Sequence, residues 1–531
     1  MQCDVLIVGA GGSGLVAAIN AHESGAKVIV LTKEYPTRSQ TCMAQGGINA
    51  ALGNAGEDSV ESHIANTLKS AHGLADESSV EFLCSNAPKA LEWLDSIGVP
   101  FSRTDDAKIA QRKLGGASSS RACYAQDYTG LKILHTLYDR CLALGIEILS
   151  ERYLLECITN TTDSNLDVSG VSVLNKRSGE VEIYSAKSVI LATGGYSRVY
   201  NTHSTNSVST TGDGIATAYR AGASVSDMEF VQFHPTAMKN SAILISESAR
   251  GAGGYLLNSK GERFTNELAP RDEVARAIDD EILKGEDVFL DIRHLGEEFI
   301  DEELPQERKL ARLYENVDPV YELIPIKPVA HYTMGGIEVD KNSQTSIKGL
   351  FAVGECSNHK VHGANRLGGN SLLELVVFGK QAGENAASYS KNKSQHISVD
   401  SSTCSLVDDA MSNDTLINFY EKQKELGELF YLYVGVKRDK STLEEVKGKL
   451  LDIKKDVAKM GVEDKSKIYN TNLIEFLEFK NILEISELIL LGAINRDESR
   501  GAHYRVDDMQ EDDSRFKAHT VINSGVLKYE D

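Results

Sequence analysis

Residues 3–14 read CDVLIVGAGGSG, an apolar run that ends in the glycine-rich string Gly9-Ala10-Gly11-Gly12-Ser13-Gly14. The apolar run predicts a buried strand, residues 13–24 predict a helix, and residues 27–32 predict a second strand. Glycines let the backbone approach a pyrophosphate, and the first N–H groups of the helix bind it. The stretch therefore favours a βαβ unit that binds a dinucleotide, with a tight turn without a ligand as the alternative.

The loop after the second strand distinguishes between two dinucleotides. An NAD site usually has an acidic residue directly after that strand, and here Glu34 follows it one or two positions late. Residues 36–47, PTRSQTCMAQGG, have no apolar period and predict a long extended loop in place of the next crossover helix. Because a flavin ring can lie along the N–H groups of such a loop, the sequence favours FAD over NAD.

Two later apolar segments, 188–194 and 349–354, have the same character as the first strand and predict further parallel strands of one interrupted sheet. The predicted fold class is α/β, with a Rossmann-like FAD-binding domain, an inserted α+β capping domain and a C-terminal helical domain. The predicted boundaries are 1–228 and 329–400 for the FAD-binding domain, 229–328 for the capping (substrate) domain, 401–499 for the helical domain and 500–531 for a polar C-terminal tail on the surface.

Composition limits the partners. The chain has 531 residues and a net charge of −21, which disfavours nucleic acid and anionic membranes but leaves an anionic substrate open, because arginines in a cleft can reverse the local field. Its eight cysteines form no CxxC pair, so we expect no metal site and a cytoplasmic setting with reduced thiols. No apolar run reaches about 18 residues, so we expect no direct membrane span and attachment to a membrane only through another chain.

Motifs along nearly the whole chain resemble the flavoprotein subunits of succinate dehydrogenase and fumarate reductase. L-Aspartate oxidase is a sister family, and ELAPRDEVARAI at 267–278 resembles it more, whereas YAQDYTGLKILHTLY at 124–138 resembles the dehydrogenase and reductase side. The resembling strings are GAGGSG (9–14), AQGGINAAL (44–52), ATGG (192–195), TGDG (211–214), QFHPT (232–236), ARGAGGYLLNSKGERF (249–264), HYTMGGI (331–337), HGANRLGGNSLLELVVFG (362–379) and SRGAH (499–503).

The resemblance implies an FAD-dependent enzyme that interconverts fumarate and succinate by hydride transfer at flavin N5, in anaerobic respiration or the tricarboxylic acid cycle. It also implies an iron–sulfur subunit as partner, which connects the chain to a quinone- or thiol-linked module on the inner face of the cytoplasmic membrane. Two alternatives stay open: L-aspartate oxidase, and a non-catalytic flavoprotein that serves as a scaffold or electron-transfer subunit. The second alternative predicts loss of the site residues, yet Arg271, His331 and Arg366 are present.

The resemblance assigns roles at the substrate end. Arg271 matches the arginine that delivers the proton, and Glu247 matches the carboxylate that reprotonates it. Ser246 stands where the family usually has Thr, and Leu114 stands where it usually has Phe, so a methylated or amino dicarboxylate stays open as the substrate. The residues matched to substrate binding are His234, Ser246, His331, Arg366 and Leu114.

The same motifs assign the flavin site and its linkage. In most relatives the position of Gln40 holds a histidine that bonds covalently to the flavin, and an amide cannot form that bond. We therefore predict tightly but non-covalently bound FAD, with the amide of Gln40 near the ring edge. The predicted cofactor residues are Gly9, Gly11, Gly14, Thr32, Ser39, Gln40, Thr41, Gln45, Gly46, Asp213, Glu355, Arg366, Ser371 and Leu372.

Overall fold

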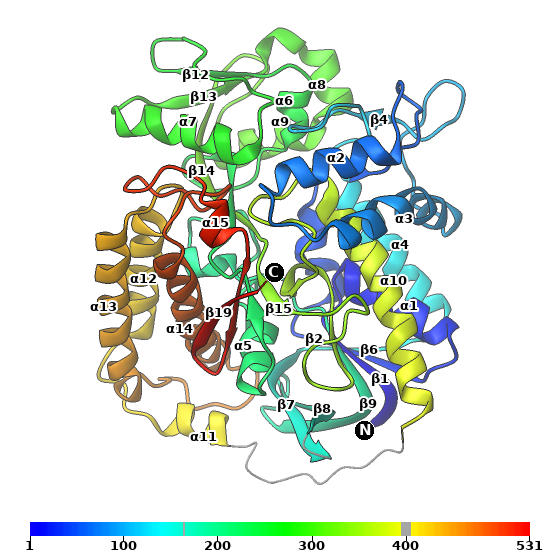
Figure 1. Cartoon of the computed structure of the whole chain (residues 1–531), viewed down its shortest axis with the longest axis vertical. Helices are drawn as coiled ribbons and strands as arrows, with labels where there is room; N and C mark the ends of the chain where they lie inside the picture. Colours follow the sequence, from blue (N-terminus) through cyan, green and yellow to red (C-terminus); the bar gives the residue numbers. More distant parts are fainter. Residues whose placement is uncertain (163–164, 394–404, 531) are drawn as a thin grey trace.

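The computed structural model describes residues 1–162, 165–393 and 405–530. A central α/β part contains the first strand and the first helix of the chain. A smaller α+β part lies at one end, and a group of long helices lies along one side (Figure 1). The described chain thus has the α/β class with an inserted part and a helical part, as predicted. Among the described residues, no helix is both long and apolar enough to cross a bilayer.

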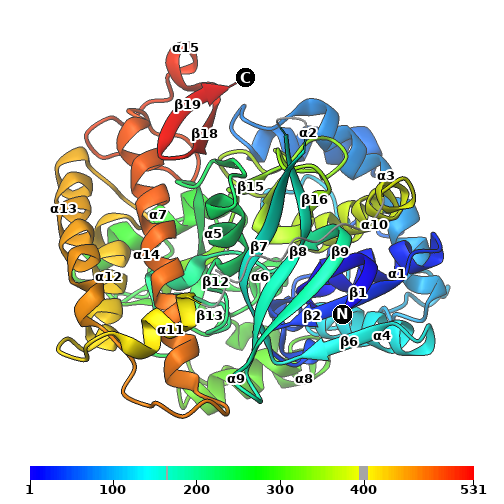
Figure 2. The same ribbon diagram turned by 90° about the horizontal axis from the view of Figure 1, so that it is seen from below.

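The central sheet has the order β6-β2-β1-β9-β8-β7, and β16 also pairs with β9 (Figure 2). Strand β1 is parallel to β2 and β9, while β7, β8 and β9 are antiparallel. Side chains of β1 alternate between two cores: Val5 and Ile7 pack with α1 and α10, and Leu6 and Val8 with the opposite cluster. The strands are β1 (Gln2–Val8), β2 (Val28–Thr32), β6 (Glu147–Ser150), β7 (Arg152–Thr162), β8 (Asn165–Asn175), β9 (Val181–Leu191) and β16 (Leu350–Ala352).

Helices cover this part of the molecule. Helix α1 packs along α10, which belongs to the second half of the FAD-binding part. The helices are α1 (Gly12–Glu23), α2 (Val60–Ser70), α3 (Glu77–Ser96), α4 (Thr129–Ala143), α5 (Asp213–Arg220) and α10 (Asn370–Lys391).

The inserted part, called the cap below, is built on the antiparallel sheet β11-β14-β13-β12. Its two long strands, β11 and β14, pair from Val231 opposite Thr333 to Met238 opposite Ile326 and connect the cap to the FAD-binding part. The cap elements are β11 (Val231–Met238), α6 (Glu247–Gly251), β12 (Tyr255–Asn258), α7 (Arg271–Leu283), β13 (Val288–Asp291), α8 (Glu297–Glu303), α9 (Pro305–Tyr314) and β14 (Ile324–Thr333).

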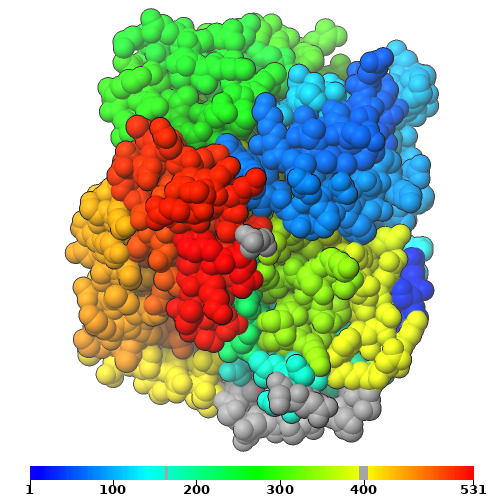
Figure 3. All heavy atoms as spheres, in the orientation of Figure 1, coloured from blue at the N-terminus to red at the C-terminus, as the bar shows by residue number. Residues whose placement is uncertain are grey.

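The C-terminal segment forms more structure than the surface tail that its polar sequence suggested. Residues of β18 pair with β10 (Val225–Ser226), which lies nearly 300 positions earlier, and β19 continues the sheet. In the space-filling view the segment lies between the helical part, the cap and the N-terminal helices (Figure 3). The elements after the FAD-binding part are α11 (Ser405–Ser412), α12 (Phe419–Tyr433), α13 (Lys440–Asp456), α14 (Thr471–Asn495), α15 (Asp513–Phe516), β18 (His519–Asn523) and β19 (Val526–Glu530).

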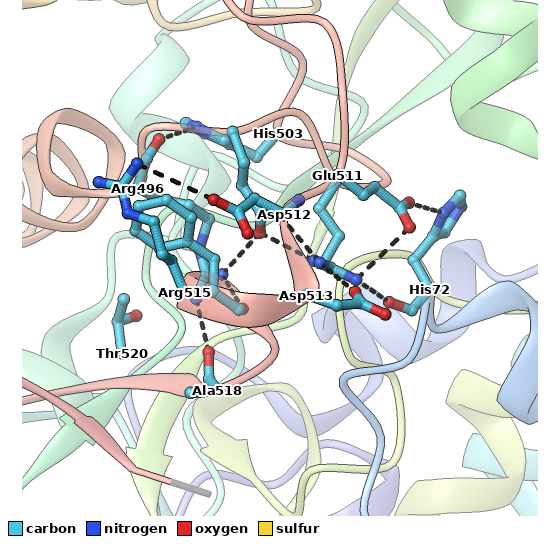
Figure 4. A network of polar contacts seen from close by, with 12 residues as sticks. His72, Arg496, His503, Glu511, Asp512, Asp513, Arg515, Ala518 and Thr520 are labelled. Carbon is cyan, nitrogen blue, oxygen red and sulfur yellow. Dashed lines mark hydrogen bonds and ion pairs between the residues drawn. The ribbon is translucent and has the colours of Figure 1, made fainter.

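Buried ion pairs fasten this segment (Figure 4). Arg496 donates to Glu229 at 2.7 Å and to Glu498 at 3.0 Å, and all three side chains are buried. Arg500 donates to the same Glu498 at 2.8 Å and to the carbonyl oxygen of His72 at 2.7 Å. Because removing one member of such a network leaves an unpaired buried charge, the network fixes the end of the chain against the FAD-binding part.

Candidate active site

One continuous cavity joins the predicted flavin residues to the predicted substrate residues. It opens where the parallel strands β1, β2, β9 and β16 end, at Val8, Thr32, Leu191 and Ala352. The residues after each of these strands line it: Gly9–Ser13, Lys33–Tyr35, Ala192–Gly194 and Gly354–Glu355. Ligands of open α/β sheets bind at this carboxyl edge.

The glycine string shapes the wall of the cavity. Gly9 has a φ of +113°, and a Cβ there would lie 2.1 Å from the carbonyl oxygen of Ala192. Gly14 does not line the cavity: a Cβ on it would lie 2.0 Å from the carbonyl oxygen of Gly9, so its role is to let α1 start against β1. Every other predicted cofactor residue lines the cavity.

Several polar atoms in this wall have no partner among the described residues. They are buried, and they include Ser39 Oγ, Gln45 Oε1, Thr193 Oγ1 and Arg366 Nε. Buried polar atoms are normally hydrogen-bonded, so four orphans around one cavity indicate a polar ligand. The glycine wall, the orphans and the start of α1 together fit FAD, with the pyrophosphate at Gly11–Ser13.

The sequence predicted that the loop at 36–47 is extended, but the loop forms two short 3₁₀ turns, Pro36–Arg38 and Gln40–Met43. The Gln40 side chain lines the cavity, and its Oε1 accepts a hydrogen bond of 2.8 Å from the Ser207 N–H. The histidines among the described lining residues are His234 and His331, which lie with the predicted substrate residues. The described wall near Gln40 therefore presents an amide and no imidazole to the cofactor.

His234 and His331 come together because β11 and β14 are paired strands. Their ring centroids are 4.8 Å apart, and the Nδ1 of His331 is 2.8 Å from the Thr205 hydroxyl. Burial, aided by nearby positive charges, lowers the pKa of both imidazoles well below 6.5. Both rings are therefore neutral at pH 7 and serve as hydrogen-bonding groups, not as cations.

Arg271, the first residue of α7, is buried and is held by two partners. Its Nε and Nη2 both donate to Glu247 Oε2, at 3.1 and 2.6 Å, and its Nη1 donates to Gln232 Oε1 at 3.0 Å. Arg366 Nη2 donates to the same Gln232 oxygen at 3.0 Å, and the Arg366 guanidinium stacks 4.2 Å from the centre of the Tyr332 ring. One amide oxygen thus places two guanidinium groups side by side.

Glu247 stays charged in this buried position. Burial by itself raises the pKa of its carboxyl, but the positive charges of Arg271 and Arg250 outweigh burial, and the pKa is lowered. Its Oε1 also accepts the Gly115 N–H at 3.1 Å, and a Cβ on Gly115 would lie 2.3 Å from that oxygen. The cap and the FAD-binding part therefore meet at this carboxylate without room for a side chain.

Arg250 lies between this carboxylate and the backbone of Glu267 in the cap. Arg250 Nη2 is 3.3 Å from Glu247 Oε1, and Arg250 Nη1 donates to the carbonyl oxygen of Glu267 at 2.5 Å. Glu267 in turn pairs at 2.8 Å with Arg263, whose side chain is 54% exposed. Around the predicted substrate residues, Arg271, Arg366 and Arg250 face one charged carboxylate, so the local field is positive in a chain of net charge −21.

Ser246 and Leu114 line the cavity beside these groups. The backbone N–H of Ser246 donates to Glu307 Oε1 at 2.9 Å, and Glu307 lies in the first turn of α9. Asp127 of the FAD-binding part accepts hydrogen bonds from the N–H groups of Gln306 and Glu307 at 2.7 and 3.3 Å. Its carboxylate therefore binds the N-terminus of α9, a helix of the inserted part. Burial raises the pKa of Glu307 to about 8 and that of Asp127 to about 6.

The raised pKa of Glu307 predicts that the stability of the folded chain depends on pH. Because Glu307 binds its proton more tightly in the folded chain, its contribution is full below pH 4.5 and is lost as the pH rises towards about 8. We expect Glu307→Gln, which keeps an acceptor for Ser246, to reduce the loss of melting temperature between about pH 5 and pH 8 by a few degrees. Thermal unfolding of both proteins tests this, with the exposed Glu302→Gln as control. An unchanged difference across that pH range would show that Glu307 does not titrate there.

The structure brings the predicted substrate and catalytic residues to one end of the cavity and the predicted cofactor residues, except Gly14, to its wall. It also adds residues that the sequence reasoning did not select. One of them is Gln232, which stands in the QFHPT string two positions before His234. Because side chains alternate along a strand, residues two positions apart lie on the same face, and this spacing could have indicated Gln232.

Lys33 bonds to Asp213 at 2.6 Å and to Glu478 at 2.7 Å, so Asp213 is already paired. Among the described residues, no cluster of three His, Cys, Asp or Glu is arranged to hold a metal.

Comparison with known proteins gives matches along the chain. A family model described as FAD binding domain matches residues 4–372, and one described as Fumarate reductase flavoprotein C-term matches residues 423–531. The succinate dehydrogenase flavoprotein subunit of Rickettsia conorii is 38% identical over 98% of this chain and 92% of its own length. The 8-methylmenaquinol:fumarate reductase flavoprotein subunit of Wolinella succinogenes is 40% identical over 98% and 88%. A solved structure of quinol-fumarate reductase with menaquinol molecules has a TM-score of 0.95 at 36% identity and covers 100% of this chain and 98% of the other.

Proposed function

Since the chain belongs to the family of flavoprotein subunits of succinate dehydrogenase and fumarate reductase, we propose that it interconverts the two dicarboxylates and works mainly as a fumarate reductase. The observation that carries the proposal is the pair Arg271 and Arg366, held side by side by one Gln232 oxygen in a buried cavity. Arg271, Arg366 and Arg250 share the single charged carboxylate of Glu247, so a dicarboxylate dianion supplies the negative charge that is missing there.

In the reducing direction, FAD supplies a hydride when it is bound. Arg366 grips one carboxylate through its free Nε–H, and His234, His331 and Ser246 donate to the remaining carboxylate oxygens. Arg271 gives a proton to the carbon next to the one that received the hydride, and Glu247, 2.6 Å away, holds the guanidinium in place. Glu247 then returns a proton to Arg271, and Arg250, whose Nη2 lies 3.3 Å from Glu247 Oε1, is the next charged neighbour of this carboxylate. The closed contact at Gly115 excludes water from the transfer.

The proposed direction rests on the cofactor linkage. We expect non-covalent FAD, because Gln40 lines the cavity at the position of the linking histidine. An electron-withdrawing covalent substituent makes a flavin easier to reduce, and about 30 mV corresponds to about 1.4 kcal/mol for two electrons. A flavin without that bond is a stronger donor to fumarate and a weaker acceptor from succinate.

Acid precipitation of the purified protein tests the linkage. We expect the yellow chromophore in the supernatant, while a covalent flavoprotein treated in parallel keeps its flavin in the pellet. Flavin that stays with the washed pellet would contradict the proposal.

Turnover assays test the reaction and its direction. We expect faster fumarate reduction with a reduced artificial dye than succinate oxidation with an artificial acceptor. L-Aspartate is assayed beside them with detection of the imino acid product, because aspartate oxidases also reduce fumarate. Faster succinate oxidation would overturn the direction, and imino acid formation would favour the sister activity.

We further propose that the electrons arrive through an iron–sulfur subunit that docks on this chain and attaches it to the membrane. Among the described residues there is no cysteine cluster that could hold an iron–sulfur centre. The names of the relatives support this, since they are flavoprotein subunits of succinate dehydrogenase and of quinol-linked or 8-methylmenaquinol-linked fumarate reductases.

A further inference from the structure

Two hydrogen bonds restrict the orientation of the Ser246 hydroxyl group. Its oxygen accepts the Ser248 N–H at 3.1 Å, as the N-cap of α6, and it also accepts the Ser248 hydroxyl at 2.7 Å. A hydroxyl oxygen has two lone pairs and one proton. Both lone pairs of the Ser246 oxygen accept hydrogen bonds, so towards any further partner this hydroxyl can act only as a donor.

The Ser246 side chain lines the cavity. Ser246 and Ser248 are each 2% exposed, so bulk water does not compete for the pair. Among the described residues, no acceptor receives the Ser246 hydroxyl proton, while the side chain lines the same cavity as Arg271 and Arg366. A carboxylate bound there is the acceptor that completes the arrangement.

We propose that Ser248 is a positioning residue, whose hydroxyl fixes the Ser246 hydroxyl as a donor towards one carboxylate of the bound dicarboxylate. The inference rests on the proposed function. Without the Ser248 hydroxyl, Ser246 regains a free lone pair, and its proton can turn away from the cavity. The substrate carboxylate then meets an oxygen lone pair part of the time, which weakens binding.

The effect is separable from the stability of α6. Ser248→Ala keeps the backbone N–H that Ser246 caps and the Glu307 contact that holds the Ser246 backbone. Because a hydrogen bond to a carboxylate is present in both the ground state and the transition state, its loss raises KM and changes kcat little.

A double-mutant cycle tests the proposal on the holoprotein. The variants are Ser248→Ala, Ser246→Ala and both together, with Ser241→Ala, a partly buried cap serine outside the cavity, as the matched control. The readouts are the steady-state kinetics of fumarate reduction and the dissociation constant of malonate, a non-reacting dicarboxylate, from the change in flavin absorbance. We expect Ser248→Ala to raise KM and the malonate constant about fivefold with kcat within about twofold. In the Ser246→Ala background the second change should add nothing.

Other outcomes separate the two hypotheses. Equal effects of Ser248→Ala with and without the Ser246 hydroxyl, or a fall in kcat at unchanged KM, would overturn the positioning role. If fumarate is not reduced but malonate binds, the proposed function fails, and the malonate cycle still decides the role of Ser248. If the unchanged protein neither reduces fumarate nor binds malonate, both are overturned.

Discussion

Replacing Arg271 by Met is expected to lower the rate of fumarate reduction by about 10²- to 10⁴-fold, the range of a general acid. The substitution removes the proton donor and leaves the Glu247 carboxylate with the more distant Arg250 as its ionic partner, at 3.3 Å in place of 2.6 Å. The apolar side chain retains part of the volume, so the pocket should stay filled. Rapid mixing of the reduced protein with fumarate measures the step directly.

The control for this variant is Arg276→Met on the same helix. Arg276 pairs with Asp272 and donates to the Gly501 carbonyl oxygen, outside the cavity, so its loss should leave turnover within a few-fold. The flavin content of both variants should equal that of the unchanged protein. An Arg271→Met protein that keeps more than about a tenth of the rate would show that another group delivers the proton.

Replacing Arg366 by Gln is expected to lower kcat/KM for fumarate by about 10²- to 10³-fold. The guanidinium is 3% exposed, and burial, followed by the charge of Arg271, lowers its pKa to about 10, so it is still a cation at pH 7. Its Nε–H has no partner among the described residues. Two hydrogen bonds from a cation to a carboxylate contribute about 1.5–3 kcal/mol each, and glutamine supplies at most one neutral bond.

The matched variant is Arg366→Lys, which keeps the charge but not the fork of donors. We expect an intermediate loss, because an ammonium cannot bind a carboxylate in a bidentate way and at the same time reach Gln232. Equal activity of the lysine variant and the unchanged protein would show that charge alone matters. Steady-state kinetics over a range of fumarate concentrations measures both constants.

Local sequence predicted which residues line the cavity next to the parallel strands, because these residues follow the strands directly. Gly9, Thr32 and Glu355 each stand within three residues of a strand end, and parallel strands bring their ends to one edge. The family resemblance supplied Arg271 and Glu247, which the charged RDE pattern by itself would place on a surface.

Other features depend on contacts that no local pattern encodes. Asp127 and Glu307 lie 180 positions apart, and no sequence pattern near either residue indicates that Asp127 binds the N-terminus of the helix that contains Glu307. The loop at 36–47 was expected to be extended because it lacks an apolar period, but Pro36 favours a helical turn and the chain forms two 3₁₀ turns. The polar composition of 500–531 concealed a strand, since β18 is only five residues long and pairs with a distant partner.

The late position of β18 has a consequence for synthesis on the ribosome. Val225 can pair with Ile522 only after nearly 300 further residues have been made, and Glu229 can pair with Arg496 only 267 residues after its own synthesis. Until residue 496 has been made, the Glu229 carboxylate, which is buried in the folded chain, lacks this counter-ion. A stop codon shortly before residue 519 therefore removes both β18 and β19 and leaves β10 as the edge strand of this sheet.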